Sequence, residues 1–369
     1  MQRVIADPLF GIGKNAKYDF GQLMKLPIAA ALEKRSIYDQ SLLRGRVSDD
    51  DFYHHFSNKL KLESLQKLFR CHILQIKKML KHRNLLHERI IIAIDKTEEH
   101  YWGGINNLFV TGGKRQASTN YAFRYLTAAI VINGQRFIIY VRALTKDDND
   151  DAQLVEECLE EIRKLGFEVG TLLADREFYN GTILLLCNGR NVEYVIPAVK
   201  NEKFLRLADD LHKERQRFPC VIPDYDISGS QTCLVIYEEK NGEGKSEIFG
   251  FITNIDAYEI SDDVEAIIEL YKLRWGIENA HKYEDRFRIS TNSTNGLIRF
   301  FFFMIGVIFH NVWVMLNLLA VSLGLPSLSL NVFVDILKRS QGIRGVQSYK
   351  HPQRQLWVKI LLGKNTTKG

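Results

Sequence analysis

The chain has few cysteines, and they form no recognisable structural motif. The five cysteines are an odd number and include no Cys-x-x-Cys pair, so neither a disulfide framework nor a zinc knuckle is indicated. The opening segment, Met1-Gln-Arg-Val-Ile-Ala-Asp7, lacks the apolar core of a secretory signal. We therefore expect free thiols and a protein that is made and used in a reducing cytoplasm.

Two other signals are missing or rare. The glycine-rich stretch Thr111-Gly-Gly-Lys114 has neither the spacing of a nucleotide-binding P-loop nor a following Ser or Thr. Only one long apolar run occurs, at residues 297–320, and four polar side chains interrupt it: Arg299, His310, Asn311 and Asn317. Since such side chains are costly in lipid, we expect a helix buried on the back of the protein's main sheet and no membrane partner. A membrane-spanning helix is the alternative.

Acidic residues are absent from residues 338–369, which carry eight Lys or Arg. Residues 1–88 carry 16 Lys or Arg against 9 Asp or Glu. Because the whole chain has a net charge of +6, the segment between these ends is acidic, near −9. Basic ends around an acidic centre are typical of a protein that binds phosphates at its periphery and metal ions in the middle. The alternative is a charge distribution that only keeps the surface soluble.

Three acidic residues stand where chemistry is expected. Asp95 ends the apolar run Arg89-Ile-Ile-Ile-Ala-Ile-Asp95, and Asp175 ends the run Val169-Gly-Thr-Leu-Leu-Ala-Asp175. Such runs are typical of buried parallel strands, whose carboxyl ends border the ligand-binding crevice of an open α/β sheet. Glu278 lies in the helical-looking stretch Tyr271-Lys-Leu-Arg-Trp-Gly-Ile-Glu278. The pattern predicts a site assembled from two strands and a helix.

Carboxylates are ligands for hard divalent cations. Mg²⁺ takes oxygen ligands, and two such ions about 4 Å apart can bind the attacking and the leaving oxygen of a phosphodiester. Asp95, Asp175 and Glu278 together could bind that pair of ions. Taken singly, each has an ordinary structural explanation: an Asp at a strand end caps the next turn, and Glu278 pairs with Lys282 one helical turn later.

The residues around the three carboxylates resemble the DDE transposases of insertion sequences. The shared motifs are Asp-x-Thr at Asp95-Lys-Thr97, Asp-Arg-x-Phe at Asp175-Arg-Glu-Phe178 and, most specific, Tyr-x2-Arg-x3-Glu ending at Glu278. The similarity spans roughly residues 89–290 in the right order. The family branch with the Tyr-Arg-Glu-Lys signature has a Lys seven residues after the Glu. This chain has Asp285 at that position, and Lys282 is the nearest substitute.

The resemblance implies a metal-dependent DNA endonuclease and strand transferase with a ribonuclease H-like catalytic domain. Asp95, Asp175 and Glu278 would be both the catalytic residues and the ligands of two Mg²⁺ ions, for which Mn²⁺ can substitute. The expected partners are the double-stranded transposon ends and the target DNA, bound by a homodimer in the nucleoid of the cytoplasm.

The same resemblance assigns DNA contacts to Tyr271, Arg274 and Lys282. Because successive helical residues are about 100° apart, we expect these three side chains and Glu278 to lie within one stripe of one helix. Ser261-Asp262-Asp263 is the expected N-terminal cap of that helix.

The expected order of elements from residue 89 is strand, hairpin, helix, strand, helix and strand, which resembles the ribonuclease H-like core. The resemblance implies an α/β chain with a ribonuclease H-like mixed sheet and flanking helices. Within it, Asn133-Gly134 is the strongest hairpin signal, between strands at residues 121–132 and 136–144. The expected division is a helical segment at 1–88, the catalytic domain at 89–200 and 257–337, a β-rich insertion at 201–256, and a basic tail at 338–369.

Some functional alternatives are open. Residues 1–88 are either a helix-turn-helix-like unit that recognises element ends or a helical cap that only supports the catalytic domain. The chain as a whole is either an active transposase, a catalytically decayed or domesticated copy that binds DNA without cutting it, or a nuclease on the same fold that cuts without joining.

Overall fold

The computed structural model describes residues 17–45, 47–116, 118–132, 134–214, 218–240, 246–257, 260, 263–343, 356–357 and 359–361. Within helices and strands, the side chains of Lys240, Trp275, Glu278 and Asn279 lie outside this description. The chain forms two compact units. The helical unit takes its described residues from Met1–Leu80, Trp102–Asn107 and Ala280–Gly369, and the sheet unit from Lys81–Tyr101 and Leu108–Asn279.

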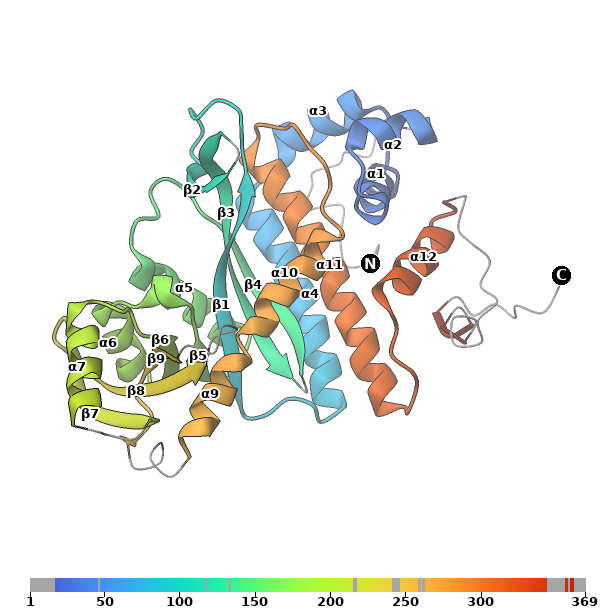
Figure 1. The fold of residues 1–369 in the computed structure, drawn as a ribbon. Coiled ribbons are helices and arrows are strands. Elements are labelled where there is room, and N and C mark those ends of the chain that lie inside the picture. Colours follow the sequence, from blue (N-terminus) through green and yellow to red (C-terminus); the bar gives the residue numbers. More distant parts are fainter. Residues whose placement is uncertain are drawn as a thin grey trace. The chain divides into compact units, whose positions relative to one another are not determined.

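Six helices provide the main elements described for the helical unit (Figure 1). They are α1 (Phe20–Glu33), α2 (Ile37–Arg44), α3 (Asp49–Lys59), α4 (Leu62–His82), α11 (Gly296–Ser322) and α12 (Leu330–Ser340). Local sequence explains how α3 begins. The Ser48 side chain accepts a hydrogen bond from the Asp51 N–H, and the positive end of the helix dipole stabilises the acidic side chains of the first turn.

Helix α11 is the core of the helical unit. It is long and apolar enough to cross a membrane, yet 67% of its most apolar window is buried inside the structure. Aromatic rings from α3 pack on it, with Phe56 stacked on Phe301 at 5.3 Å between ring centroids. Two of its buried polar side chains are hydrogen-bonded within the unit: Arg299 Nε donates to the Ser293 carbonyl over 2.6 Å, and Asn317 Nδ2 donates to the Leu328 carbonyl over 3.2 Å. These features are those of a buried core helix.

One mixed sheet dominates the sheet unit, with the strand order β2-β3-β1-β5-β6-β9-β8-β7 and with β4 paired to β3. Its strands are β1 (Arg89–His100), β2 (Val110–Gln116), β3 (Thr119–Ile132), β4 (Gln135–Ala143), β5 (Glu168–Leu173), β6 (Glu193–Pro197), β7 (Cys220–Ile227), β8 (Ser230–Lys240) and β9 (Ser246–Thr253). The helices are α5 (Asp151–Lys164), α6 (Gly181–Gly189), α7 (Glu202–Lys213), α9 (Val264–Lys272) and α10 (Trp275–Asp285), whose last residues belong to the helical unit.

The strands β4-β3-β1-β5-β6 have the ribonuclease H-like arrangement that the resemblance implied. Strands β1, β3 and β4 are antiparallel, and β5 and β6 run parallel to β1. Helices α5 and α6 pack together beside this sheet (Figure 1). The predicted β3–β4 hairpin is confirmed, with Ile132 paired to Gln135 and Gly134 at a φ of 74°, a conformation that glycine adopts readily. Asn133 lies outside the described residues.

The segment 201–256 contains more than the expected strands. It begins with α7, whose Phe204 is fully buried, and continues into β7, β8 and β9. Strand β9 pairs with β6 through Val195 and Thr253, so these strands extend the central sheet. The glycine-rich stretch Thr111-Gly-Gly-Lys114 belongs to strand β2 at the other edge of the sheet.

Replacement of Phe56 by Ala should destabilise the protein. The Phe56 side chain is 1% exposed and stacks on Phe52 and Phe301, so its removal leaves a cavity that costs about 3–5 kcal/mol of unfolding free energy. Urea denaturation measures the loss. The control is Leu74→Ala on α4, where the side chain is 49% exposed and a change within about 0.5 kcal/mol is expected. Equal losses in the two variants would contradict the packing described for α3 and α11.

Candidate active site

Asp95 and Asp175 lie at matching positions on two neighbouring parallel strands. Ala93 in β1 pairs with Leu173 in β5, and each aspartate follows two residues later. The chain stays extended to Asp175, since Ala174 N–H donates to the Val195 carbonyl over 3.4 Å and Asp175 has φ −83° and ψ −179°. Because side chains alternate along a strand and neighbouring strands lie about 4.8 Å apart, both carboxylates leave the same face of the sheet side by side.

A bulge in β5 creates this alignment. Ile90 pairs with Val169, but the next residue, Ile91, pairs with Thr171, so Gly170 is skipped. Without that extra residue, Asp95 would align with Ala174 and Asp175 would point to the opposite face, because a one-residue slip inverts every side chain. Glycine fits the bulge because a Cβ at this position would lie only 3.0 Å from the Cβ of Arg89.

Strand β1 extends beyond the apolar run that ends at Asp95. Strand β1 continues five residues past Asp95 to His100, and His100 pairs with Ala122 of β3. The reason is that β3 is long enough to pair with β1 far beyond the last residue of β5. Asp95 therefore lies inside strand β1. Before Asp95 the strand has both β3 and β5 as neighbours, and after it only β3 pairs with it among the described strands.

Burial dominates the electrostatics of Asp175 and raises the pKa of its carboxyl group. The nearby charge of Glu177 raises it further, whereas a hydrogen bond from the Glu177 N–H to Asp175 Oδ1 over 2.9 Å and the positive charges of Arg274 and Lys114 lower it. That hydrogen bond starts the 3₁₀ helix η2 (Arg176–Phe178). The carboxylate thus has cations in its surroundings from β2 and from the segment between α9 and α10.

Ion pairs occupy the other face of β1. Lys96 Nζ lies 2.7 Å from Asp151 and 3.6 Å from Glu177, and its side chain is 7% exposed. Arg124 of β3 lies 3.2 Å from Glu98 and 3.5 Å from Glu177. Because Lys96 follows Asp95 directly, it points away from the aspartate pair. The network holds η2, which follows Asp175, to β1 and α5.

Tyr271, Arg274, Glu278 and Lys282 do not share one continuous helix, so the expected single stripe is wrong. Helix α9 ends at Lys272, Leu273 and Arg274 form a turn, and α10 begins at Trp275 (Figure 1). Asp263 caps α9 by accepting from the Ala266 N–H; Ser261 and Asp262 lie outside the described residues.

Arg274 is the cation of this turn, and Tyr271 orients it. The Arg274 side chain is buried at 8% exposure, and its Nε donates to the Tyr271 hydroxyl over 2.6 Å. The Tyr271 ring in turn packs on Phe251 of β9 at 4.6 Å between centroids. The positive charge of Arg274 lowers the pKa of Asp175, so the guanidinium charge acts on this carboxyl group.

Glu278 lies in the first turn of α10, and its side chain is outside the described part. Among the described side chains, no group of three or more His, Cys, Asp or Glu is close enough to hold a metal ion. Lys282, in the same helix, is exposed. Asp285, at the position where a Lys was expected, pairs with Lys34 at 3.4 Å and with Arg288 at 2.9 Å, so its carboxylate has a structural role in the helical unit.

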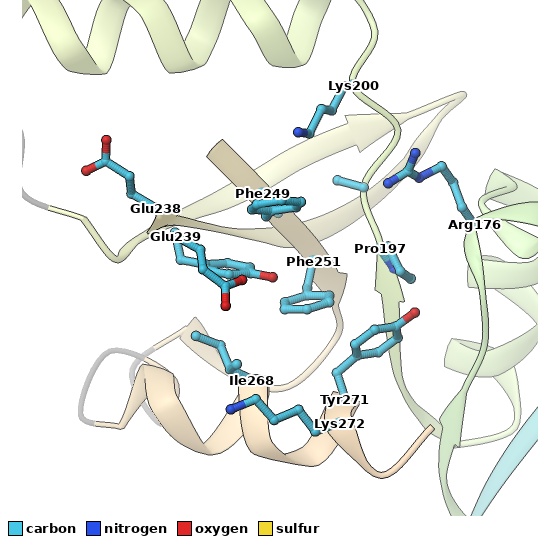
Figure 2. A pocket seen from close by; sticks show the side chains of 13 residues that line it. Arg176, Pro197, Lys200, Glu238, Glu239, Phe249, Phe251, Ile268, Tyr271 and Lys272 are labelled. Carbon is cyan, nitrogen blue, oxygen red and sulfur yellow. The ribbon is translucent and has the colours of Figure 1, made fainter. Parts of the chain in front are cut away.

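A pocket of about 460 Å³ lies between β8, β9 and α9. Figure 2 shows Tyr271 and Lys272 of α9 on one side and Lys200 and Arg176 on the other. The ring of Phe249 contacts the Lys200 ammonium at 4.2 Å. Arg176, the residue after Asp175, belongs to the lining. The lining combines these aromatic rings and cations with the carboxylates of Glu238 and Glu239 (Figure 2).

Sequence reasoning missed several of these residues. The pocket combines residues from the segments around η2, β6, β8, β9 and α9. Arg176 and Tyr271 belong to the sequence motifs, but no local motif links the other lining residues to them. The ion pairs of Arg124 were also missed. Arg124 lies directly opposite Glu98 on two antiparallel strands, so the pairing register of these strands would have indicated the contact.

Comparisons with known proteins agree with this geometry. Residues 86–311, more than half of the chain, match the family model described as Transposase DDE domain. The cryo-EM structure of the piggyBac transposase synaptic complex with hairpin DNA is similar, with a TM-score of 0.57 and 13% identity, over 100% of this chain and 82% of that chain. At this identity the likeness concerns the fold, which confirms the predicted fold class. No curated protein sequence matches the chain.

The raised pKa of Asp175 predicts a pH-dependent stability change. Since the folded-state pKa lies above the ordinary value, ionisation of Asp175 destabilises the metal-free protein as the pH rises through the folded-state pKa. Asp175→Asn should therefore be more stable than the wild type at pH 7 in a chelating buffer, and the difference should shrink as the pH falls toward the ordinary value of 3.8.

Urea denaturation across this pH range measures the difference, with Asp209→Asn on the exposed face of α7 as the control that should show no gain. A metal-free Asp175→Asn protein that is less stable than the wild type at pH 7 would contradict burial as the dominant influence.

Proposed function

The chain belongs to the DDE transposase family, whose members cut and join DNA, and we propose that it is the transposase of an insertion sequence that works by two-metal phosphoryl transfer. The observation that carries the proposal is the register of Asp95 and Asp175 on neighbouring parallel strands beside the positive charge of Arg274. Two adjacent carboxylates and a cation are the groups that a phosphodiester and its metal ions require.

Asp95, Asp175 and Glu278 are the proposed metal ligands and catalytic residues. Their chemistry fits divalent ions, because carboxylates are hard oxygen donors and because burial disfavours the charge of Asp175 unless a cation compensates it. DDE transposases use divalent metal ions, and Mg²⁺ is proposed here, with Mn²⁺ as a substitute. When bound, the pair of ions would supply charge stabilisation at the attacking and leaving oxygens of the phosphodiester.

Arg274, Tyr271 and Lys282 are the proposed DNA contacts. The guanidinium of Arg274 would neutralise a phosphate next to the aspartate pair. Tyr271 would hold that guanidinium in place through the 2.6 Å hydrogen bond between Arg274 Nε and its hydroxyl. Lys282, which is exposed on α10, would contact the DNA backbone. This contact would leave the ion pairs of Asp285 with Lys34 and Arg288 intact.

Substitution of the three carboxylates tests the proposal. Asp95→Asn, Asp175→Asn and Glu278→Gln should each lower cleavage by more than about 100-fold, because each removes a charge that binds metal ions in the transition state. The measurement uses labelled DNA that carries the ends flanking this gene, with Mg²⁺ or Mn²⁺ present. Glu202→Gln is the control, since this exposed carboxylate on α7 pairs only with Arg206 among the ion pairs described.

The outcomes separate the alternatives. Metal-dependent cuts at the element boundary, followed by strand joining, support the transposase. Cuts without joining indicate a nuclease on the same fold, and binding by a well-folded protein without any cut indicates a decayed or domesticated copy. Unchanged cleavage in any of the three carboxylate variants would remove that residue from the proposed site.

Tyr271→Phe should lower the cleavage rate about 10-fold, because Arg274 loses a hydrogen-bond acceptor while buried. The Phe ring keeps its packing on Phe251, so the change isolates the hydroxyl. Single-turnover cleavage at saturating DNA measures the effect. Tyr237→Phe is the matched control in the same aromatic cluster, and an equal loss in both variants would show that the hydroxyl of Tyr271 has no specific role.

The expected homodimer and its action at the nucleoid rest on the resemblance. Two copies would pair the two ends of one element, so the proposal predicts a complex of two chains with two DNA ends. The mass of the protein–DNA complex in solution tests this: a complex with a single chain at both low and high protein concentration would contradict it.

A further inference from the structure

The carbonyl group of Leu273, at the end of α9, is held by an arginine from a distant strand. Arg136, near the start of β4, donates to this oxygen from Nε over 3.2 Å and from Nη2 over 2.9 Å. The carbonyl groups at a helix C-terminus have no partner within the helix and carry partial negative charge. The guanidinium supplies both hydrogen bonds and an opposite charge, and it forms a clamp between β4 and the α9–α10 turn.

Gly276 makes room for this clamp. Its N–H donates to the same Leu273 carbonyl over 3.2 Å. A Cβ atom at position 276 would overlap the Arg136 guanidinium, 2.5 Å from its Cζ and 2.6 Å from its Nη2. A side chain at position 276 would therefore displace the guanidinium from the place that it occupies at the start of α10.

The clamped segment is wound more tightly than an α-helix. Four backbone hydrogen bonds in it join each N–H to the carbonyl three residues earlier, from Leu273 to Leu270, Arg274 to Tyr271, Gly276 to Leu273 and Ile277 to Arg274. Such bonds are those of a 3₁₀ helix, which turns by about 120° per residue where an α-helix turns by about 100°. The direction in which residue 278 leaves α10, relative to Tyr271, therefore depends on this segment.

We propose that Arg136 is a positioning residue for DNA cleavage: its clamp on Leu273 fixes the winding between α9 and α10, and with it the orientation of Arg274 and of the first turn of α10, which contains Glu278. The inference rests on the proposed function, because only there do Arg274 and Glu278 act on phosphate and metal. Arg136 acts through the Leu273 peptide group, and its role is orientation.

Cleavage kinetics across a metal titration test the role. Arg136→Gln should lower the single-turnover rate at saturating DNA about 10-fold or more, and raise the Mg²⁺ concentration that gives half the maximal rate at least about threefold, with DNA affinity within about twofold of the wild type. Arg136→Lys should recover part of the rate, because an ammonium group can still donate to one carbonyl.

The matched control is Arg190→Gln in the same unit, which removes ion pairs of 2.6 Å to Glu156 and 3.1 Å to Glu160 on α5 and should leave the rate and the metal dependence unchanged. Wild-type kinetics in Arg136→Gln would overturn the proposal. A loss of DNA affinity equal to the loss of rate would also overturn it, because a positioning residue changes the reaction of bound DNA.

A double-mutant cycle tests the mechanism of the clamp. Gly276→Ala should lower the cleavage rate because its Cβ displaces the guanidinium of Arg136. Once Arg136 is Gln, the same Cβ displaces nothing, so the double variant should be no more than about twofold slower than the slower single variant. Losses that multiply would overturn the proposal, since they would show that the two residues act independently.

Hydrogen exchange separates this inference from the proposed function. In the metal-free protein, the amides of Gly276 and Ile277 should exchange about 10-fold faster in Arg136→Gln than in the wild type, while the amides of β5 stay unchanged. If the wild type cuts no DNA, the proposed function fails, and this measurement alone decides whether the clamp exists. Equal exchange in the two proteins would overturn it.

Discussion

The parallel pairing of β1 with β5 is the constraint on which the rest of the site depends. Its register is held by apolar side chains, since Ile92 and Leu172 pair with each other and are both fully buried. The two aspartates repel each other when ionised, so their own interaction cannot hold them together. Core packing fixes the pairing of the two strands. The bulge at Gly170 shifts that pairing by one residue, so that Asp95 and Asp175 leave the same face of the sheet.

A second constraint is the turn between helices α9 and α10, which carry the other motif residues. A single long helix through residues 264–285 would carry Tyr271, Arg274 and Glu278 at fixed α-helical angles. The turn at Leu273 replaces those angles with 3₁₀ winding, and it lets Arg274 bond back to Tyr271 while α10 starts anew. In this chain the motif Tyr-x2-Arg-x3-Glu therefore spans the end of α9, a turn and the start of α10.

Much of the fold could be predicted because its signals are local. The apolar run before Asp95 and the hairpin at Gly134 each depend on neighbouring residues, and the structure contains both a strand and a hairpin there. The extension of β1 beyond Asp95 could not be read in this way, because its residues are polar and their pairing partner is supplied by β3. Local patterns predict elements, whereas their ends depend on partners far along the chain.

The candidate site divides along the same line. Its motif residues could be named from the sequence, but their arrangement could not. At the helix interruption, the Leu273 carbonyl accepts hydrogen bonds from Arg136, which lies more than a hundred residues earlier. The pocket that includes Arg176 is lined by β8 and β9, which join the central sheet through the β6–β9 pairing. Periodicity within residues 264–285 contains no information about either contact.

The distribution of charge around the site follows from the alternation of side chains on β1. Lys96 and Arg124 are engaged with Asp151, Glu177 and Glu98 on one face, so these cations do not neutralise the aspartates on the other. The pKa of Asp175 is raised, because burial outweighs the lowering effects of the hydrogen bond from the Glu177 N–H and of the more distant charges of Arg274 and Lys114. A carboxylate in that state gains most from a cation that arrives with the substrate or from solution. In the proposed site a divalent ion would supply that charge, whereas an ion pair at this position would already have supplied it in the metal-free protein.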